Sequence, residues 1–426
     1  EELRRKQHRP HAPFAKPLKP DPKPPGRKSG DDYGTKAFRS VPPRIDEIHA
    51  APLPEKCPVC GGGVEFLKTA EQFQTEIPKI EPVYRKFNVA IGRCTGCHKR
   101  VQSRHELQTS DALGAAKSQM GSNAQALVTR LNKHYALSHG KAVGLLSELC
   151  RTALSRGASA QIMLRAAQRC SSAYKEIQIA MRQSSCCVPD ETGWRVGGKL
   201  QWLHVFVTPQ ATLYLIRPSR GFDVAAEAIG ADYSGKITCD GWRPYERFTQ
   251  ATQQTCNAHL LRRCDQLLEI LTGGAGRFPQ AVKALLQEGL AVRDARDAGE
   301  IPLELAQAEA ARLQDDLHEI GRCTKINPDF ERFAKFLHRH QGEVFAYLKQ
   351  TGLDATNWRA EQAIRPAVVN RKVWGGSRTP NGAQAQGILM SVLRTALQHG
   401  NDALEFLAQT LRAPPNCAPR LIAVTT

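Results

Sequence analysis

The chain has 426 residues, of which 41% are hydrophobic, so it is long enough for several domains with sizeable buried cores. Its 59 Lys and Arg residues against 41 Asp and Glu give a formal charge of +18, which favours a polyanionic partner such as nucleic acid over an acidic small molecule. No apolar run approaches the about 18 residues of a membrane span and no signal peptide opens the chain, so we expect a cytoplasmic protein without membrane contact.

The first segment, residues 1–54, contains eleven prolines and no periodic apolar pattern. A composition of this kind cannot bury a core, and it predicts a disordered, basic, proline-rich arm. The arm is either a tether or a segment that lies in an A·T-rich minor groove through residues 25–30, PGRKSG. The chain begins with Glu1 rather than Met, which suggests that an upstream part is missing.

Two Cys-x2-Cys pairs follow, separated by 33 residues: Cys57, Cys60, Cys94 and Cys97. Each pair supplies half of a tetrahedral thiolate site, and the strand-like residues 82–92 between them indicate a ribbon hairpin. We therefore predict a zinc ribbon over residues 55–108, with Zn²⁺ as its metal. His98 is a substitute ligand or, more simply, a surface histidine. The chain has 13 cysteines, an odd number spread over a long sequence, which favours reduced thiols and metal ligands over disulfides.

Residues 109–183 show helical periodicity and are predicted to form a DNA-binding region. Two helical stretches flank the glycine-bearing turn at residues 154–159. They form either a helix-turn-helix that presents Arg165 and Arg169 to DNA, or an ordinary helical hairpin.

The sequence of residues 184–260 is typical of β-strands. Runs rich in β-branched and aromatic residues occupy 199–207, 211–218 and 235–240. The first two are separated by three residues and predict an antiparallel hairpin. Asp190 is expected on or beside a preceding strand, so the region supplies four strands.

The remaining chain is helical. Residues 261–350 predict a helical insertion, residues 351–412 return to the core, and residues 413–426 form a tail. The last helix, residues 381–400, carries one apolar stripe that must pack on a large surface.

Three acids stand out against the basic background: Asp190 in the first strand region, Asp240 at the end of the fourth strand and Glu361 on a later helix. Acids at the ends of neighbouring strands can share a hard cation such as Mg²⁺, and a helical carboxylate would complete the site. Two such metals suit phosphodiester chemistry. Alternatively, Asp190 caps a turn, Asp240 ends a strand, and Glu361 pairs with Arg365 on a solvated face.

Several motifs together resemble transposases of the insertion sequence 66 family, from about residue 15 onward. The motifs are CPVCGG, CTGC, PDETGWRVGG, WLHVFV, CDGWRPY, CNAHLLRR, NWRAEQAIRP and GGSRTPNGAQAQGILMSVLRTALQHG. The resemblance implies an α/β fold with a ribonuclease-H-like mixed sheet flanked by helices and interrupted by a helical insertion. It assigns the catalytic, metal-binding roles of a DDE transposase to Asp190, Asp240 and Glu361, with Mg²⁺ or Mn²⁺ as cofactor. Glu191 follows the first acid, but neighbouring side chains on a strand point to opposite faces, so Asp190 is the predicted ligand.

Further residues take supporting roles in this reading. Cys256, His259 and Asn357 are predicted to support the active site. For Cys256 and His259, which form a Cys-x2-His pair, the alternative is a buried thiol and a hydrogen-bonded histidine of the core. Basic residues near Glu361 are predicted to neutralise DNA phosphates: Arg359, Arg365, Arg371, Lys372 and Arg378.

The sequence thus predicts a transposase that cleaves the ends of an insertion sequence and joins the 3′-hydroxyl to target DNA. The alternatives are a metal-dependent nuclease without strand transfer and a zinc-ribbon regulator with an inactive core. The expected partners are double-stranded DNA, further copies of the chain in a homo-oligomer on DNA, and small accessory proteins of the element. A bacterial, nucleoid-associated location follows from the same resemblance. Members of that family commonly begin with a leucine-rich helical segment, which this chain lacks.

Overall fold

A computed structural model describes residues 40–113, 118–269, 276–322, 327–414 and 417–422. It divides the chain into two compact units, Glu1–Pro78 and Lys79–Thr426. The predicted disordered arm lies mostly outside the described residues; its described part, residues 40–54, contains no helix or strand. None of the helices within the described ranges combines the length and apolar character that a bilayer span requires.

Strands β1 (Ile91–Arg93) and β2 (Arg100–Gln102) form a short antiparallel hairpin at the start of the second unit. The predicted strand-like run over residues 82–92 is therefore only partly strand, because residues 82–90 are irregular. Their apolar side chains Tyr84 and Val83 are exposed, so no buried face holds these residues in a sheet.

Four helices follow, as the periodicity predicts: α2 (Ser122–Lys133), α3 (His139–Cys150), α4 (Arg156–Arg169) and α5 (Ser171–Gln183). The hydroxyls of Ser138 and Ser155 accept hydrogen bonds from the first turns of α3 and α4, which fixes where each helix begins. Arg165 is exposed on α4, whereas Arg169 is half-buried and donates to the Ala413 carbonyl.

The centre of the second unit is a five-stranded mixed sheet with the strand order β5-β4-β3-β6-β7. The strands are β3 (Cys186–Val196), β4 (Lys199–Val207), β5 (Thr212–Arg217), β6 (Lys236–Cys239) and β7 (Thr252–Thr255). β3, β4 and β5 pair antiparallel, whereas β6 pairs parallel with both β3 and β7. The predicted strands and the predicted hairpin are confirmed, but β7 was missed because its sequence, TQQT, carries no apolar signal.

Helices cover both faces of this sheet, and the alternation of side chains sorts its residues between them. On one face Val188, Val205 and Ile216 pack with α12 (Trp358–Trp374). On the other, Phe206 and Leu215 belong to the core built with α5 and α6 (Phe222–Ile229). Both faces are therefore buried, which explains the nearly continuous apolar sequences of β4 and β5.

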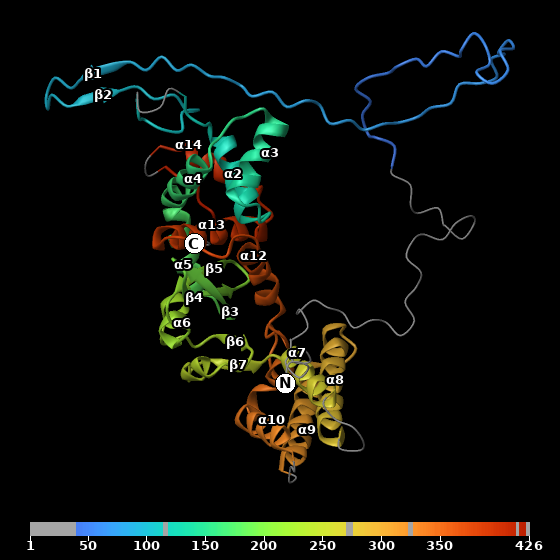
Figure 1. Cartoon of the computed structure of the whole chain (residues 1–426). Helices are drawn as coiled ribbons and strands as arrows, with labels where there is room; N and C mark the ends of the chain where they lie inside the picture. Colours follow the sequence, from blue (N-terminus) through green and yellow to red (C-terminus); the bar gives the residue numbers. More distant parts are fainter. Residues whose placement is uncertain (1–39, 114–117, 270–275, 323–326, 415–416, 423–426) are drawn as a thin grey trace, which may run out of the picture. The chain divides into compact units, whose positions relative to one another are not determined.

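Helix α13 (Pro380–Gln398) lies against the edge strand β5 (Figure 1). Its hydroxyls satisfy the outward N–H groups of that strand, because Tyr214 N–H donates to Ser391 Oγ (2.8 Å) and Thr212 N–H donates to Thr395 Oγ1 (3.1 Å). A Cβ atom at Gly387 would lie 2.9 Å from the Tyr214 carbonyl oxygen, so only glycine permits this approach. The apolar stripe of the last predicted helix thus packs on the sheet, and α13 protects its edge.

The segment between β7 and α12 is helical, as predicted: α7 (Asn257–Glu269), α8 (Arg277–Asp297), α9 (Leu303–Arg322), α10 (Pro328–Arg339) and α11 (Ala346–Lys349). These helices form a hydrophobic core of their own, separate from the two cores of the sheet. The last helix, α14 (Ala403–Arg412), packs on α2.

Candidate active site

Asp190 lies on β3 and Asp240 directly follows β6, the parallel neighbour of β3. Cys186 pairs with Lys236 and Cys187 with Ile237. Asp190 and Asp240 each lie three residues beyond this paired segment, Asp190 on β3 and Asp240 just after β6. Gly241, with a φ of +82°, then turns the chain away from the sheet, a conformation that favours glycine.

Each aspartate is oriented by a backbone amide close to it in sequence. Glu191 N–H donates to Asp190 Oδ1 (2.8 Å), and Trp242 N–H donates to Asp240 Oδ1 (3.0 Å). Burial raises the pKa of Asp190 to about 7, and the charges of Glu191, Asp240 and Glu361 contribute to the rise. A cation beside Asp190 would offset this cost, because an opposite charge stabilises the ionised carboxyl group.

Glu361 lies in the first turn of α12, on the face of the sheet to which Asp190 belongs by its parity with Val188. Its charge makes the smallest contribution to the raised pKa of Asp190. Within the described residues, however, no three His, Cys, Asp or Glu side chains lie close enough together to bind one metal ion. The donor set itself consists of carboxylate oxygens, which suit Mg²⁺ or Mn²⁺.

Two basic side chains from α7 approach Glu361. His259 Nε2 lies 3.8 Å from Glu361 Oε1. A terminal guanidinium nitrogen of Arg262 lies 3.6 Å from the same oxygen. Burial lowers the pKa of His259, and the positive charge of Arg262 lowers it further, whereas Asp240 and Glu361 raise it. His259 thus lies next to two of the three acids. Arg262 was missed by the sequence analysis, although it stands one helical turn after His259 in CNAHLLRR.

Cys256 and Asn357 join the two ends of the helical insertion. Both side chains are buried, at 0% and 1% exposure. Asn357 precedes the first residue of α12, and Cys256 precedes the first residue of α7. Nearby, Asn257 N–H donates to the Ala355 carbonyl (2.9 Å). Contacts between the segment that precedes α7 and the segment that precedes α12 therefore fix the start of α12, whose first turn carries Glu361.

The predicted DNA-binding residues differ in their surroundings. Arg359 Nε donates to Asp354 Oδ2 (2.6 Å), and its guanidinium lies 5.1 Å from the Trp358 ring centroid. Arg371 donates to Thr192 Oγ1 (2.9 Å) and to the Gly193 carbonyl, which ties α12 to β3. Three others are exposed along this helix and the loop after it: Arg365, Lys372 and Arg378.

Glu191 is part of a buried network that sequence reasoning missed. Its side chain is 3% exposed, and it accepts hydrogen bonds from Arg220 and Tyr245. Asp190 shares a face with Val188, whereas Glu191 shares the opposite face with Cys187. The sequence signal for this network was Arg220 in RPSRGFD, because a buried acid requires a cationic partner.

The two cysteine pairs adopt the same local backbone structure, each within its own unit. Cys57 N–H donates to Gly62 O (2.8 Å) and Gly61 N–H to Cys57 O (2.9 Å). The second pair repeats this pattern, with Cys94 N–H donating to Lys99 O (2.9 Å) and His98 N–H to Cys94 O (3.0 Å). In each pair, the backbone amide of the second cysteine is the main cause that lowers the pKa of the first thiol. Such turns favour thiolates, as a Zn²⁺ site requires.

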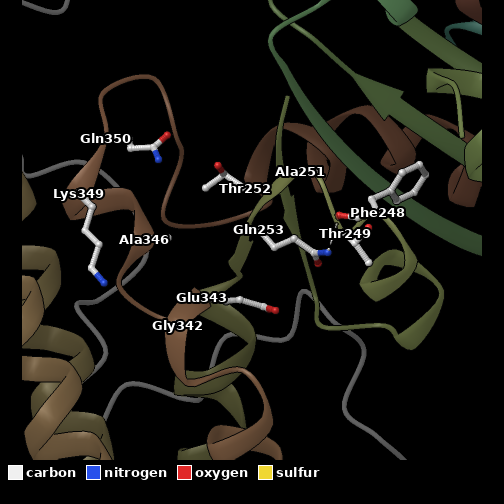
Figure 2. A pocket seen from close by; sticks show the side chains of 10 residues that line it. All are labelled: Phe248, Thr249, Ala251, Thr252, Gln253, Gly342, Glu343, Ala346, Lys349 and Gln350. Atoms are coloured by element: carbon white, nitrogen blue, oxygen red, sulfur yellow. Dashed lines mark hydrogen bonds between the residues drawn. The ribbon is translucent and has the colours of Figure 1, made fainter. Parts of the chain in front are cut away.

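A separate hollow of about 340 Å³ lies at the outer edge of the sheet. Figure 2 shows side chains of β7 and the turn before it on one side, among them Gln253, and those of residues 342–350 on the other, among them Glu343 and Lys349. None of the three acids lines it, so it is not the candidate active site.

Comparison with known proteins identifies a protein family that this chain matches. The model of the Transposase IS66 family matches residues 117–385, a range that contains all three acids together with Cys256 and His259 but not the cysteine pairs. A protein of Sinorhizobium fredii, described as uncharacterized protein y4qI, is 25% identical over 222 residues, which are 48% of this chain and 40% of that protein. The chain thus spans less than half the length of the curated relative that it matches.

Proposed function

Because the chain belongs to the IS66 family of transposases, we propose that it is a DDE transposase that cleaves the ends of an insertion sequence and joins them to target DNA. In the first step a water oxygen forms a bond to the scissile phosphorus, and the 3′-oxygen leaves as a hydroxyl group. In the second step this hydroxyl attacks a target phosphodiester, and the target's own 3′-oxygen leaves. No covalent protein intermediate is needed.

Asp190, Asp240 and Glu361 are the residues that would hold Mg²⁺ or Mn²⁺. When bound, two such ions activate the attacking oxygen and stabilise the charge on the leaving oxygen. The residues of the chain do the positioning. The amides of Glu191 and Trp242 orient the two aspartates, and the packing of α12 on β3 and β4 fixes the helix whose first turn carries Glu361.

The observation that carries this proposal is that Asp190 and Asp240 each lie three residues beyond the paired segment of the neighbouring parallel strands β3 and β6, together with the charges of Asp240 and Glu361 that raise the pKa of Asp190. Glu361, whose side chain is 38% exposed, makes the smallest of these contributions to the pKa of Asp190. Structural ion pairs remain an equally simple account of each acid taken singly.

A ribonuclease-H-like core is part of the proposal. Supporting it, three antiparallel strands are followed by two parallel ones, with the first strand, β3, at the centre of the sheet. The core would then comprise residues 184–260 and 351–412, interrupted by the insertion at 261–350. The separate hydrophobic core of the insertion supports this division.

The parts before the core are proposed to bind DNA. The two equivalent cysteine turns would form a zinc ribbon over residues 55–108, with Cys57, Cys60, Cys94 and Cys97 as ligands. The helices of residues 109–183 and the exposed basic residues of α12 would contact the phosphates. Assembly of several copies on DNA and the help of accessory proteins belong to the same proposal.

The test is cleavage of a duplex that carries the ends of the element encoding this chain, labelled on either strand, with Mg²⁺ or Mn²⁺. The substitutions Asp190→Asn, Asp240→Asn and Glu361→Gln should each reduce cleavage by at least about 100-fold, because a metal ligand is lost. Binding of the duplex should persist. Asp232→Asn is the matched control, since this exposed acid lies in the loop before β6.

Cleavage by the three variants at the parent's rate would refute the assignment of the acids. Cleavage without joining to a target duplex would instead identify a nuclease, and binding without any cleavage by the parent would identify a regulator.

A further inference from the structure

A buried ionic network supports the candidate active site from the opposite face of the sheet. Its centre is Glu191, whose two carboxylate oxygens are both bound. Arg220 approaches Oε1 with Nε at 2.8 Å and a terminal nitrogen at 2.6 Å, and Tyr245 Oη donates to Oε2 at 3.1 Å. This geometry compensates the buried charge of Glu191, which alone would destabilise the fold.

Arg220 also contacts two tryptophans. Its guanidinium lies 4.0 Å from the ring centroid of Trp242 and 4.8 Å from that of Trp202, both within the range of cation–π interactions. The Trp242 indole N–H donates to the Arg220 carbonyl (3.4 Å). Arg220 lies in the loop between β5 and α6, so one residue joins this loop to strand β4 and to the chain after β6.

The two ends of this network are the residues whose amides hold the aspartates. Glu191 N–H donates to Asp190 Oδ1 (2.8 Å), and Trp242 N–H donates to Asp240 Oδ1 (3.0 Å). We propose that Arg220 is a positioning residue that sets the separation and orientation of the two aspartates by linking Glu191 to Trp242 behind the sheet. The inference rests on the proposed function, because it concerns the metal site that these aspartates would form.

Electrostatics explains why such a link is needed. Asp190 and Glu191 lie within β3 and Asp240 follows the end of the neighbouring β6, and the charges of these three acids repel one another in a partly buried setting. The two strands are paired only at Cys186 and Cys187, some residues before the acids. Arg220 supplies the opposing charge and a planar group that contacts both segments, which Lys cannot reproduce.

A direct contact with DNA is the competing role for Arg220. Its side chain is 30% exposed, and its Nε and one terminal nitrogen are occupied by Glu191. We therefore expect its loss to affect the metal and the catalytic rate, and not the affinity for DNA.

The experiment compares Arg220→Met, Arg220→Lys and Glu191→Gln with the matched control Arg217→Met in the full chain. Arg217 also bonds a glutamate, Glu227, with Nε at 2.9 Å, and it lies three residues before Arg220, but that pair does not reach the aspartates. Three quantities are measured: Mn²⁺ binding by electron paramagnetic resonance, the single-turnover cleavage rate and the Kd for end DNA.

Arg220→Met should raise the half-saturating Mn²⁺ concentration by about 10- to 100-fold, as expected when support for a metal ligand is lost. It should lower the cleavage rate while the Kd for DNA stays within about twofold of the parent's. Arg220→Lys keeps the charge and loses the planar contact, so it should show a smaller change in the same direction. Combining Arg220→Met with Glu191→Gln should add little, because both act through one network.

Unchanged Mn²⁺ binding in a folded Arg220→Met or Arg220→Lys protein would overturn the inference, as would a change matched by Arg217→Met. A raised Kd for DNA with normal Mn²⁺ binding would assign Arg220 to the substrate instead. If the parent itself neither binds Mn²⁺ nor cleaves DNA, the proposed function fails; if the parent does both and the variants match it, only the role of Arg220 fails.

Discussion

Cys256 and Asn357 hydrogen bond to each other in both directions across the base of the helical insertion. The thiol donates to Asn357 Oδ1 (3.1 Å), and Asn357 N–H donates to Cys256 Sγ (3.3 Å). Because these residues immediately precede α7 and α12, the pair closes the insertion at the point where the chain returns to the core with Glu361.

This relationship predicts that Cys256 supports Glu361 from a distance. Cys256→Val removes the thiol bond and leaves the buried Asn357 amide without its partner, so the free energy of unfolding should fall by about 1–3 kcal/mol. The cleavage rate should fall more than the DNA affinity, since Glu361 loses its fixed position. Cys264→Val is the control, because this buried thiol lies in the core of the insertion. Equal losses of rate in both variants would contradict the prediction.

The buried ammonium group of Lys133 predicts a pH-dependent stability. Burial lowers its pKa to about 7, and its Nζ donates to Gln386 Oε1 (2.6 Å). The unfolded lysine has a pKa of about 10.4, so between these values the unfolded state binds more protons. The destabilising effect of Lys133 should therefore be fully present below pH 7 and decrease as the pH rises from about 7 to 10.

Denaturant titrations of the parent and Lys133→Met measure this effect. The difference between their free energies of unfolding should shrink by up to about 1.4 kcal/mol per pH unit above pH 7. Parallel pH profiles for the two proteins would show that Lys133 does not titrate in this range.

The two equivalent cysteine turns predict one shared zinc ion. Purified protein should contain about one Zn²⁺ per chain, and Cys57→Ser and Cys94→Ser should each lose it, because each turn supplies half of a tetrahedral site. Cys417→Ser, which alters an exposed free cysteine, should retain it. Elemental analysis of the three variants decides the matter, and retention of zinc in both ligand variants would rule out the ribbon.

Exposed basic residues of α12 and the following loop predict a salt-dependent affinity for DNA. Lys372→Ala and Arg378→Ala should each reduce the slope of log Kd against log salt concentration by about 0.9, the value expected for one phosphate contact. Arg371→Ala should behave differently and lower the stability, because Arg371 already bonds Thr192 and Gly193 of β3. A loss of slope in the Arg371 variant alone would reverse this assignment.

The hydroxyl bonds between α13 and β5 predict a specific stability effect. Thr395→Val is nearly isosteric but leaves Thr212 N–H unpaired at the sheet edge, which should cost about 1–3 kcal/mol and promote aggregation. Thr410→Val is the matched control, since that hydroxyl bonds only the Phe406 carbonyl of its own helix. Thermal unfolding and light scattering should separate the two, and equal behaviour would contradict the edge argument.

Much of the sheet was predictable from its sequence, and the reasons are local. The runs in β4 and β5 are apolar and β-branched because both faces of the sheet are buried, and the four-residue connection between these strands favours a hairpin. β7 escaped prediction because Gln254 and its neighbours form a strand only through their pairing with β6. Such tertiary pairing has no signal in the residues themselves.

The site was predictable in part. The three acids were predicted as carboxylates at or near the ends of neighbouring strands, and their shared role stays a prediction; Asp240 does follow the end of β6, whereas Asp190 lies inside β3. The contacts that orient them were not predictable, because Arg220 lies in an irregular loop 29 residues from Glu191 and Cys256 lies 101 residues from Asn357. Residues joined over such distances carry no shared periodicity or spacing.

The position of α12 and α13 late in the chain has a consequence for synthesis. A nascent protein that has emerged only as far as β7 contains the two aspartates, yet Glu361 and the hydroxyls of Ser391 and Thr395 are still to be made. Until then one face and one border of the sheet stay open to water and to neighbouring chains. Cutting activity should therefore arise only after α12 and α13 have been synthesised, and products that terminate before these helices should be inert and prone to precipitate.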